Sequence, residues 1–173
     1  MLMSSFVLAI TGPAGSGKST VANLLAKQID KCVNIDADHV KHMVSNPFIY
    51  DDSTEGVKLW ELLGDNIGAL AANFVNSGYN VIINGYINEP AWHKILEHIQ
   101  LTHRLLLLPK IDEVIKRDLL RHEDYVMGEK AVREHYDYFS TSHFFDDFFR
   151  LDTSEQTNEE TVNFIKRDIL SIS

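Results

Sequence analysis

The chain has 173 residues and a formal net charge of −9, with 45% apolar and 24% charged residues. This composition is typical of a globular protein that buries one core. The acidic balance argues against a general nucleic-acid surface, because such a surface needs a basic field. The longest apolar run is too short to cross a bilayer. We therefore expect neither nucleic acid nor membrane as a partner.

We also expect a single-domain protein of the cytoplasm. The N-terminal stretch MLMSSFVLAI has no basic segment and no cleavage pattern, so no signal peptide is predicted. Cys32 is the one cysteine of the chain, which permits no internal disulfide and fits a reducing cytosol. No repeat, low-complexity tract or linker divides the sequence, which predicts one domain over residues 1–173. The oligomeric state is left open.

Short apolar runs alternate along the chain with longer amphipathic runs. In chain order they predict a strand at 6–11, a helix at 17–29, a strand at 32–36, a helix at 56–77, a strand at 79–85, a helix at 90–100, a strand at 104–109, helices at 111–122 and 128–139, a strand at 148–153 and a helix at 158–170. Strands that alternate with helices pair in parallel through right-handed crossovers. The expected fold is a three-layer α/β domain with helices on both faces of the sheet.

The sequence GPAGSGKST lies between the first predicted strand and the first predicted helix. It matches the phosphate-loop pattern G-x-x-x-x-G-K-[ST], in the strand-to-helix context that this motif requires. Its glycines allow backbone N–H groups to point at phosphate oxygens, the lysine reaches the β- and γ-phosphates, and the serine hydroxyl holds Mg²⁺. The expected nucleotide-binding residues are Gly12, Gly15, Ser16, Gly17, Lys18, Ser19 and Thr20. A glycine-rich turn with a surface lysine is the alternative.

Two carboxylates, Asp36 and Asp38, follow the second predicted strand. Residues two apart lie on the same side of an extended segment, and the carboxyl ends of parallel strands line one crevice. Both carboxylates should therefore face the phosphate loop. Phosphoryl transfer needs a metal and a base, so Asp36 suits the Mg²⁺ shell through water and Asp38 suits the base. The alternative is a strand-end cap and a solvated carboxylate.

Four segments in order, GPAGSGKST, IDADHV, RDLLRHEDYVMGEKAVREHY and LDTSEQTNEETV, resemble the small P-loop kinases of small molecules. This group includes gluconate kinase, shikimate kinase and chloramphenicol phosphotransferase, with the zeta-type toxin kinases as more distant relatives. The resemblance implies a nucleoside-monophosphate-kinase-like fold with strand order 2-3-1-4-5. It also implies ATP with Mg²⁺ as donor, a hydroxylated small molecule as acceptor, and an aspartate at position 38 that serves the acceptor hydroxyl.

The resemblance further implies a lid over residues 117–135 that carries arginines. Arg117 and Arg121 are four apart, and so on one helical face, and they precede a hinge-like segment with Gly128. A closing arginine neutralises developing charge and excludes water. Arg121 is therefore a catalytic candidate and Arg117 a nucleotide-binding one. An ordinary charged helix face is the alternative.

The chain departs from its apparent relatives at two positions. Where they often carry a further lid arginine, this sequence has Asp124 and Tyr125, and Arg133 is the candidate replacement. Where many end the third strand with an aspartate, this sequence has Asn84, which offers hydrogen bonds but no charge. After the fifth strand, Thr153 aligns with the loop that packs on adenine in the family.

These residues predict an ATP-dependent phosphotransferase whose acceptor is a sugar acid, polyol, nucleoside or antibiotic. Few cations fall on the acceptor side of the sequence, with Lys41, Lys58 and Lys94 as the candidates, which disfavours a strongly anionic acceptor. A regulatory P-loop ATPase without an acceptor is an alternative that Asn84 favours. A zeta-toxin-like kinase is another. The sequence has no N-K-x-D guanine motif, which disfavours a GTP switch.

Overall fold

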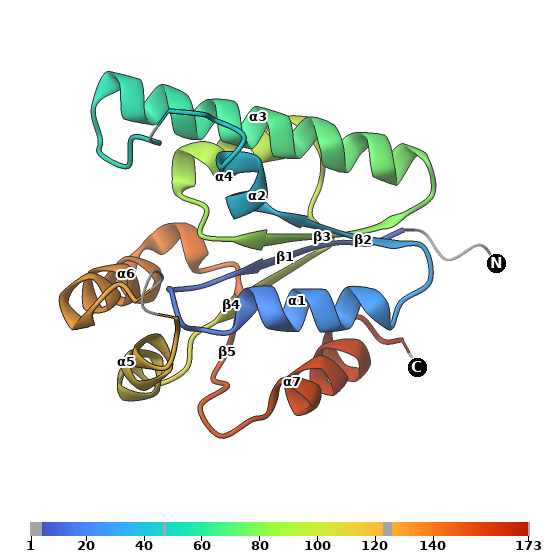
Figure 1. The fold of residues 1–173 in the computed structure, drawn as a ribbon. Helices are drawn as coiled ribbons and strands as arrows, with labels where there is room; N and C mark the ends of the chain where they lie inside the picture. The colour runs from blue at the N-terminus through green and yellow to red at the C-terminus, as the bar shows by residue number, and fades with distance from the viewer. Residues whose placement is uncertain (1–4, 47, 123–125, 173) are drawn as a thin grey trace.

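The computed structural model of the chain describes residues 5–46, 48–122 and 126–172. It shows a five-stranded sheet with helices on both faces, as the sequence predicts (Figure 1). The strands are β1 (Val7–Thr11), β2 (Cys32–Asp36), β3 (Asn80–Gly85), β4 (His103–Leu107) and β5 (Phe149–Leu151). Their order is β2-β3-β1-β4-β5 and every pair is parallel, which confirms the expected topology.

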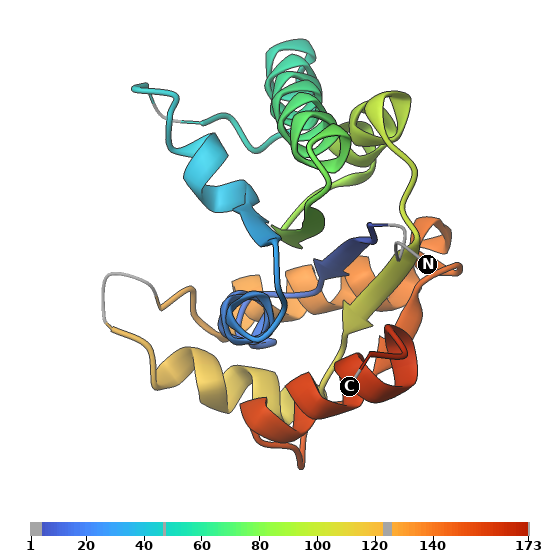
Figure 2. The same ribbon diagram turned by 90° about the vertical axis from the view of Figure 1, so that its right-hand side faces the viewer.

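The helices form the two outer layers. They are α1 (Lys18–Lys27), α2 (Ala37–Lys41), α3 (Thr54–Asn76), α4 (Glu89–His98), α5 (Ile111–Leu119), α6 (Glu129–Thr141) and α7 (Asn158–Phe164), and a five-residue π-helical turn, Ile165–Ile169, continues α7. Helices α3 and α4 pack on one face of the sheet and α1 and α7 on the other (Figures 1 and 2). No helix within the described residues is both long and apolar enough to span a bilayer.

Alternate residues of the central strands enter separate cores. In β1, Val7 and Ala9 pack with the α3 and α4 side, whereas Leu8 and Ile10 pack with the α1 and α7 side. Successive side chains of a strand point to opposite faces, so a strand covered on both faces must be apolar throughout. This is why the strands read as continuous apolar runs in the sequence.

A short helix, α2, was missed in the sequence reading. It begins directly after β2, and the Asp36 side chain caps it by accepting a hydrogen bond from the Asp38 backbone N–H at 2.9 Å. Asp38 therefore lies in the first turn of a helix. The expectation that Asp36 and Asp38 share one side of an extended segment is wrong, because the strand ends at Asp36.

The carboxyl ends of the strands meet at the edge of the sheet where α5 and α6 lie, away from both chain termini (Figure 1). The loop after β1, the cap after β2 and the end of β3 all reach this edge. In an open parallel sheet this is where ligands bind. The candidate site is assembled there.

Candidate functional site

The loop after β1 has the backbone shape of a phosphate cradle. Gly12 has φ +152°, and a Cβ there would lie 2.4 Å from the Leu107 carbonyl oxygen, so only glycine fits. Gly17, at φ +88°, is the residue preceding α1, and no side chain caps that helix. An uncapped N-terminus leaves backbone N–H groups available to an anion. The loop fits a phosphate group.

Several buried polar atoms lack a hydrogen-bond partner within the described part of the chain. They include Ser16 Oγ, Asn84 Oδ1, Trp92 Nε1, His135 Nδ1 and Thr153 Oγ1. Ser16 and Thr153 belong to the two loops that the sequence assigns to the nucleotide. A buried polar group without a partner is costly, and a bound ligand can satisfy it.

Lys18 is buried at the centre of the site, with 8% of its surface exposed. Its Nζ donates a hydrogen bond to the Pro13 carbonyl oxygen at 3.2 Å. Burial lowers the pKa of Lys18 to about 8, although the charges of Asp38 and Asp36 oppose the shift. An ammonium group in this position is stabilised by an anionic ligand.

Nucleotide affinity should therefore depend on pH. The triphosphate favours protonated Lys18, so affinity should fall as the pH rises above about 8, where the free protein loses that proton. Linkage of one proton to binding limits the fall to about tenfold per pH unit. Titration of a fluorescent ATP analogue across this range measures it. A Lys18→Arg variant that still binds should lose the dependence, since arginine does not titrate there; an equal dependence in both proteins would contradict the assignment.

Two pockets lie side by side at this edge of the sheet. The smaller, of 590 Å³, is lined by Gly15, Gly17, Lys18, Ser19, Thr20, Arg117, Arg121, Gln156, Thr157 and Asn158. The larger, of 690 Å³, is lined by Ala14, Lys18, Ser19, Asp38, Lys41, Tyr50, Asp52, Val57, Trp60, Tyr86, Asn88, Glu89, Pro90, Arg121, Met127, His135 and Tyr138. Lys18, Ser19 and Arg121 line both. The smaller pocket holds most of the predicted nucleotide-binding residues, and the larger one holds Asp38.

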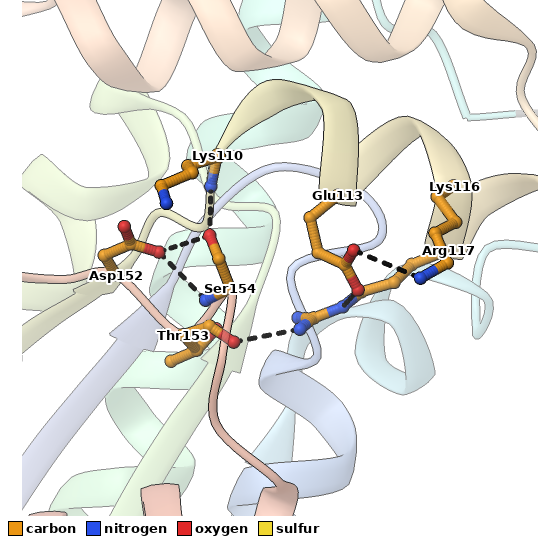
Figure 3. Close-up of polar contacts among 7 residues, drawn as sticks. All are labelled: Lys110, Glu113, Lys116, Arg117, Asp152, Thr153 and Ser154. Carbon is orange, nitrogen blue, oxygen red and sulfur yellow. Dashed lines mark hydrogen bonds and ion pairs between the residues drawn. The ribbon is translucent and has the colours of Figure 1, made fainter.

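Arg117 ties the loop after β5 to helix α5, as Figure 3 shows. Its Nη2 donates to the Thr153 carbonyl oxygen at 2.9 Å, and its Nε donates to Glu113 Oε1 at 3.0 Å. In the same loop, Ser154 Oγ accepts a hydrogen bond from the Lys110 backbone N–H at 2.7 Å. These contacts link Thr153 to Arg117, which lines the smaller pocket; Thr153 itself is not among the described lining residues, so its contact with a nucleotide stays a prediction.

A buried aspartate that the sequence pattern did not indicate connects the end of α5 to the start of α6, within the predicted lid. Asp118 is 1% exposed and its carboxylate accepts hydrogen bonds from the backbone N–H groups of Met127 and Gly128, each at 3.1 Å. Arg121 Nη1 approaches the same carboxylate at 3.4 Å. In the sequence, Asp118 lies within a run of charged residues, which is typical of a solvent-exposed helix face.

The remaining lid predictions have separate outcomes. Asp124 and Tyr125 lie outside the described residues, as does position 123 of the predicted lid. Arg133 is paired with Glu129, with Nη2 2.7 Å from Oε1, and is not among the described residues that line either pocket. The suggestion that Arg133 replaces a lid arginine gains no support from this position.

Replacing Asp118 with asparagine should loosen the lid base. The substitution removes the charge that holds two backbone N–H groups and Arg121, and hydrogen bonds to buried charged groups contribute about 1.5–3 kcal/mol. We expect faster hydrogen exchange at Met127 and Gly128 and a lower free energy of unfolding. Asp112→Asn, on the exposed face of the same helix, is the control, with an effect below about 1 kcal/mol. Equal exchange in both variants would contradict the assigned role.

Asp38 and Asp36 occupy different environments. The Asp38 carboxylate lines the larger pocket, and its Oδ1 lies 2.8 Å from Lys41 Nζ. Burial by itself would raise the pKa of Asp38, but the charges of Lys41 and Lys18 hold that pKa below its ordinary value. Asp38 is therefore an ionised carboxylate at neutral pH. Asp36 serves as the helix cap and is not among the described lining residues.

The partner of Asp38, Lys41, is only 4% exposed. Its Nζ lies over three aromatic rings, 5.8 Å from the centroid of Phe48, 5.4 Å from that of Tyr50 and 5.1 Å from that of Trp60. Ring faces and a carboxylate both attract the ammonium group. Lys41 is thus fully engaged by the protein itself.

Asn84, at the position where the sequence resemblance implies an acid, is completely buried. Its Nδ2 donates to Asn34 Oδ1 at 2.7 Å, and Asn34 in turn donates to Asn23 Oδ1 at 2.8 Å. This chain of amides links β3 to β2 and α1. Asn84 is not among the described residues that line either pocket, so its direct contact with a ligand stays a prediction.

Aromatic side chains from distant segments form one wall of the larger pocket. Tyr86 follows β3, whereas His135 and Tyr138 come from α6, with the rings of Tyr86 and His135 4.6 Å apart. Tyr138 Oη accepts a hydrogen bond from the Glu89 backbone N–H at 3.1 Å. Burial lowers the pKa of His135, as do the charges of Lys18 and Lys41, so the imidazole is neutral at pH 7.

The residues present fit a magnesium ion held mainly by phosphate oxygens. No group of three or more acidic, histidine or cysteine residues suited to a metal occurs among the described residues. Mg²⁺ in nucleotide sites typically uses one or two protein ligands beside phosphates and water. The uncapped α1 N-terminus and the buried Ser16 hydroxyl provide a phosphate cradle directly beside Ser19. Ser19 as ligand and Asp36 through water stay predictions.

Comparison with known proteins gives kinases as relatives. The chain is 32% identical over 134 residues to a bifunctional pantoate ligase/cytidylate kinase of Prochlorococcus marinus, covering 76% of this chain and 24% of that protein. It is 31% identical over 90 residues to an adenylyl-sulfate kinase of Bacillus velezensis, covering 49% of this chain and 42% of that protein. The chain thus spans less than half the length of these curated relatives. No protein-family model matches it.

Solved structures show the same fold along nearly the whole chain. A sugar kinase from Janibacter superposes with a TM-score of 0.73 at 16% identity, covering 98% of this chain and 96% of that one. The tunicamycin resistance protein of Deinococcus radiodurans gives a TM-score of 0.71 at 15% identity, covering 98% and 97%. Together with the sheet order and the phosphate loop, these likenesses show that the chain has the P-loop kinase fold.

Proposed function

We propose that the protein transfers the γ-phosphate of ATP to a hydroxyl group of a small molecule. The observation that carries the proposal is the meeting of two pockets at Lys18, Ser19 and Arg121. One pocket presents a phosphate loop, and the other presents an ionised carboxylate, Asp38. A donor and an acceptor bound in these pockets would meet at the shared residues.

The residues of the site have distinct tasks in this reaction. Lys18 and the N–H groups at the start of α1 bind the phosphates, and Arg121 neutralises the charge that develops on the transferred group. Asp38 accepts the proton of the acceptor hydroxyl. Mg²⁺, when bound, neutralises phosphate charge, with Ser19 and Asp36 as the protein groups that would hold it. Closing of the predicted lid, which carries Arg117 and Arg121, would exclude water.

The relatives support kinase chemistry but do not agree on an acceptor. Their names specify cytidylate and adenylyl sulfate among the curated proteins and a sugar among the solved structures. A fold shared at 15–16% identity does not carry a substrate with it. The acceptor must therefore be inferred from the pocket of this chain.

The test is consumption of Mg-ATP by the purified protein with sugar acids, polyols, nucleosides and hydroxylated antibiotics, beside a control without acceptor. Stimulation by one acceptor, with its phosphorylated product identified by mass spectrometry, would support the proposal.

A second candidate, a regulatory ATPase, is favoured by the uncharged and buried Asn84. Slow ATP loss that no acceptor changes would favour it and oppose transfer. Asn84→Asp should then raise the rate of hydrolysis.

A further inference from the structure

The larger pocket has an excess of negative charge on its acceptor side. Lys18 and Arg121 also line the nucleotide pocket, so the phosphates of the donor will take up their charges. Of the other described lining residues, Lys41 is the one lysine or arginine, whereas Asp38, Asp52 and Glu89 are acidic. His93 Nε2 lies 3.3 Å from Glu89 Oε1, but both side chains are at least half exposed, and water screens such a pair.

Lys41 offers no charge to an anionic acceptor. It is 4% exposed, it pairs with Asp38 at 2.8 Å and it is surrounded by the rings of Phe48, Tyr50 and Trp60. A phosphate or carboxylate entering the pocket would have to compete with Asp38 for this lysine. It would also face the exposed carboxylates of Asp52 and Glu89, whose repulsion of an anion is reduced by solvent screening.

The same pocket presents flat apolar surfaces. Tyr50 packs on Phe48 and Trp60 with ring centroids 5.2 and 5.9 Å away, yet 60% of its surface is exposed. Tyr86 lies beyond Trp60, with the two centroids 5.9 Å apart. On the lid side, Met127 is 39% exposed. A planar ring placed among these groups would cover apolar surface that water now touches.

Polar atoms on the wall are suited to a neutral ligand. His135 Nδ1 is buried and has no partner within the described residues, and its imidazole lies beside Tyr86. A neutral imidazole donates or accepts one hydrogen bond at this atom. A hydroxyl, amide or ring nitrogen of a ligand would satisfy it, and the neutral imidazole adds no positive charge to offset the charge of an anion.

Building on the proposed function, we propose that the acceptor is an uncharged hydroxylated molecule with a planar ring, and that phosphorylated and carboxylated molecules are excluded. In the transfer, a bond forms between the acceptor oxygen and the γ-phosphorus while the bond from that phosphorus to the β,γ-bridging oxygen breaks. The hydroxyl proton passes to Asp38 and ADP leaves. This ligand class differs from cytidylate and adenylyl sulfate, which are both anions.

The experiment uses matched pairs of probes. The donor pocket is filled with a non-hydrolysable ATP analogue and Mg²⁺, and binding is followed by ligand-observed NMR for cytidine against cytidylate, benzyl alcohol against benzoate, and ribitol as a polyol without a ring. Each neutral ring compound should bind at least about tenfold more tightly than its anionic partner, a difference typical of one unfavourable charge contact. Ribitol should bind more weakly than cytidine. Tighter binding of the anions, preference for ribitol, or no binding of any ring compound would overturn the proposal.

Two variants locate the ring. Tyr50→Ala should weaken binding of the neutral ring compounds by about tenfold, as expected for loss of a stacking surface. It should leave the affinity for the ATP analogue unchanged. Tyr79→Ala is the matched control, because Tyr79 is also partly exposed at 37% but is not among the described lining residues. Equal binding to both variants would place the ring elsewhere and overturn the proposal.

The binding readout separates this inference from the proposed function. Neutral ring compounds that bind in the pocket without any ATP-dependent phosphorylation of the panel would overturn the proposed function and leave the ligand class standing. Phosphorylation of an anionic acceptor in preference to its neutral partner would overturn the ligand class and leave the transferase activity standing.

Discussion

Replacing Lys18 with alanine should abolish retention of ATP by the protein. Lys18 is buried beneath the phosphate loop. Among the described lining residues, Lys18 and Arg121 are the two charged side chains that line both pockets. Removing one partner of a buried charge pair costs about 2–5 kcal/mol, which corresponds to roughly 30-fold to several thousand-fold in affinity. Titration calorimetry with Mg-ATP measures the loss.

Thermal stability distinguishes this loss from misfolding. Burial lowers the pKa of Lys18 because the charged form is poorly solvated, so the substitution should not lower the melting temperature of the nucleotide-free protein. Lys27→Ala, at the exposed end of the same helix, should bind ATP normally. Tight Mg-ATP binding by the Lys18 variant would show that the phosphate-loop assignment is wrong.

The second large effect is expected at Asp38. Asp38→Asn should keep ATP affinity within a few-fold and lower phosphoryl transfer by about 10²–10⁴, the usual contribution of a general base. The substitution also leaves Lys41 without its carboxylate partner. The measurement is kcat with an acceptor identified from the panel, accompanied by ATP affinity.

A double variant separates the two roles of Asp38. If Asp38 only neutralises Lys41, then Asp38→Asn combined with Lys41→Met removes both charges and should restore transfer. If Asp38 is the base, the double variant stays as slow as Asp38→Asn. Unchanged turnover in the single variant would remove Asp38 from catalysis.

Most of the fold could be predicted because its signals are local. Buried strands are largely apolar, and each amphipathic helix shows a hydrophobic periodicity within its own sequence. The strand at 32–36 was therefore predicted with its observed bounds, and the other strands within two residues of theirs. The phosphate loop is equally local, since motif, strand and helix are contiguous. Gly78 follows the cap of α3 with φ +79°, the backbone conformation that a helix-ending glycine adopts.

The rest of the site depends on contacts that no local pattern encodes. Helix α2 has five residues, too few to show a period, and its presence changed the setting of Asp38. In the sequence, Asp118 is typical of a solvated helix face. Its burial depends on hydrogen bonds from the backbone N–H groups of Met127 and Gly128, which the local pattern does not encode. The wall of the larger pocket brings Tyr86 and His135 together from segments about fifty residues apart, which only the tertiary structure reveals.

The junction of the two pockets also has a stereochemical consequence. Lys18, Ser19 and Arg121 border both spaces, so donor and acceptor could occupy them together. Transfer across such a junction needs one in-line displacement and no phosphorylated enzyme. A γ-phosphate made chiral with oxygen isotopes and sulfur would then emerge with inverted configuration, and initial-rate plots for the two substrates would intersect.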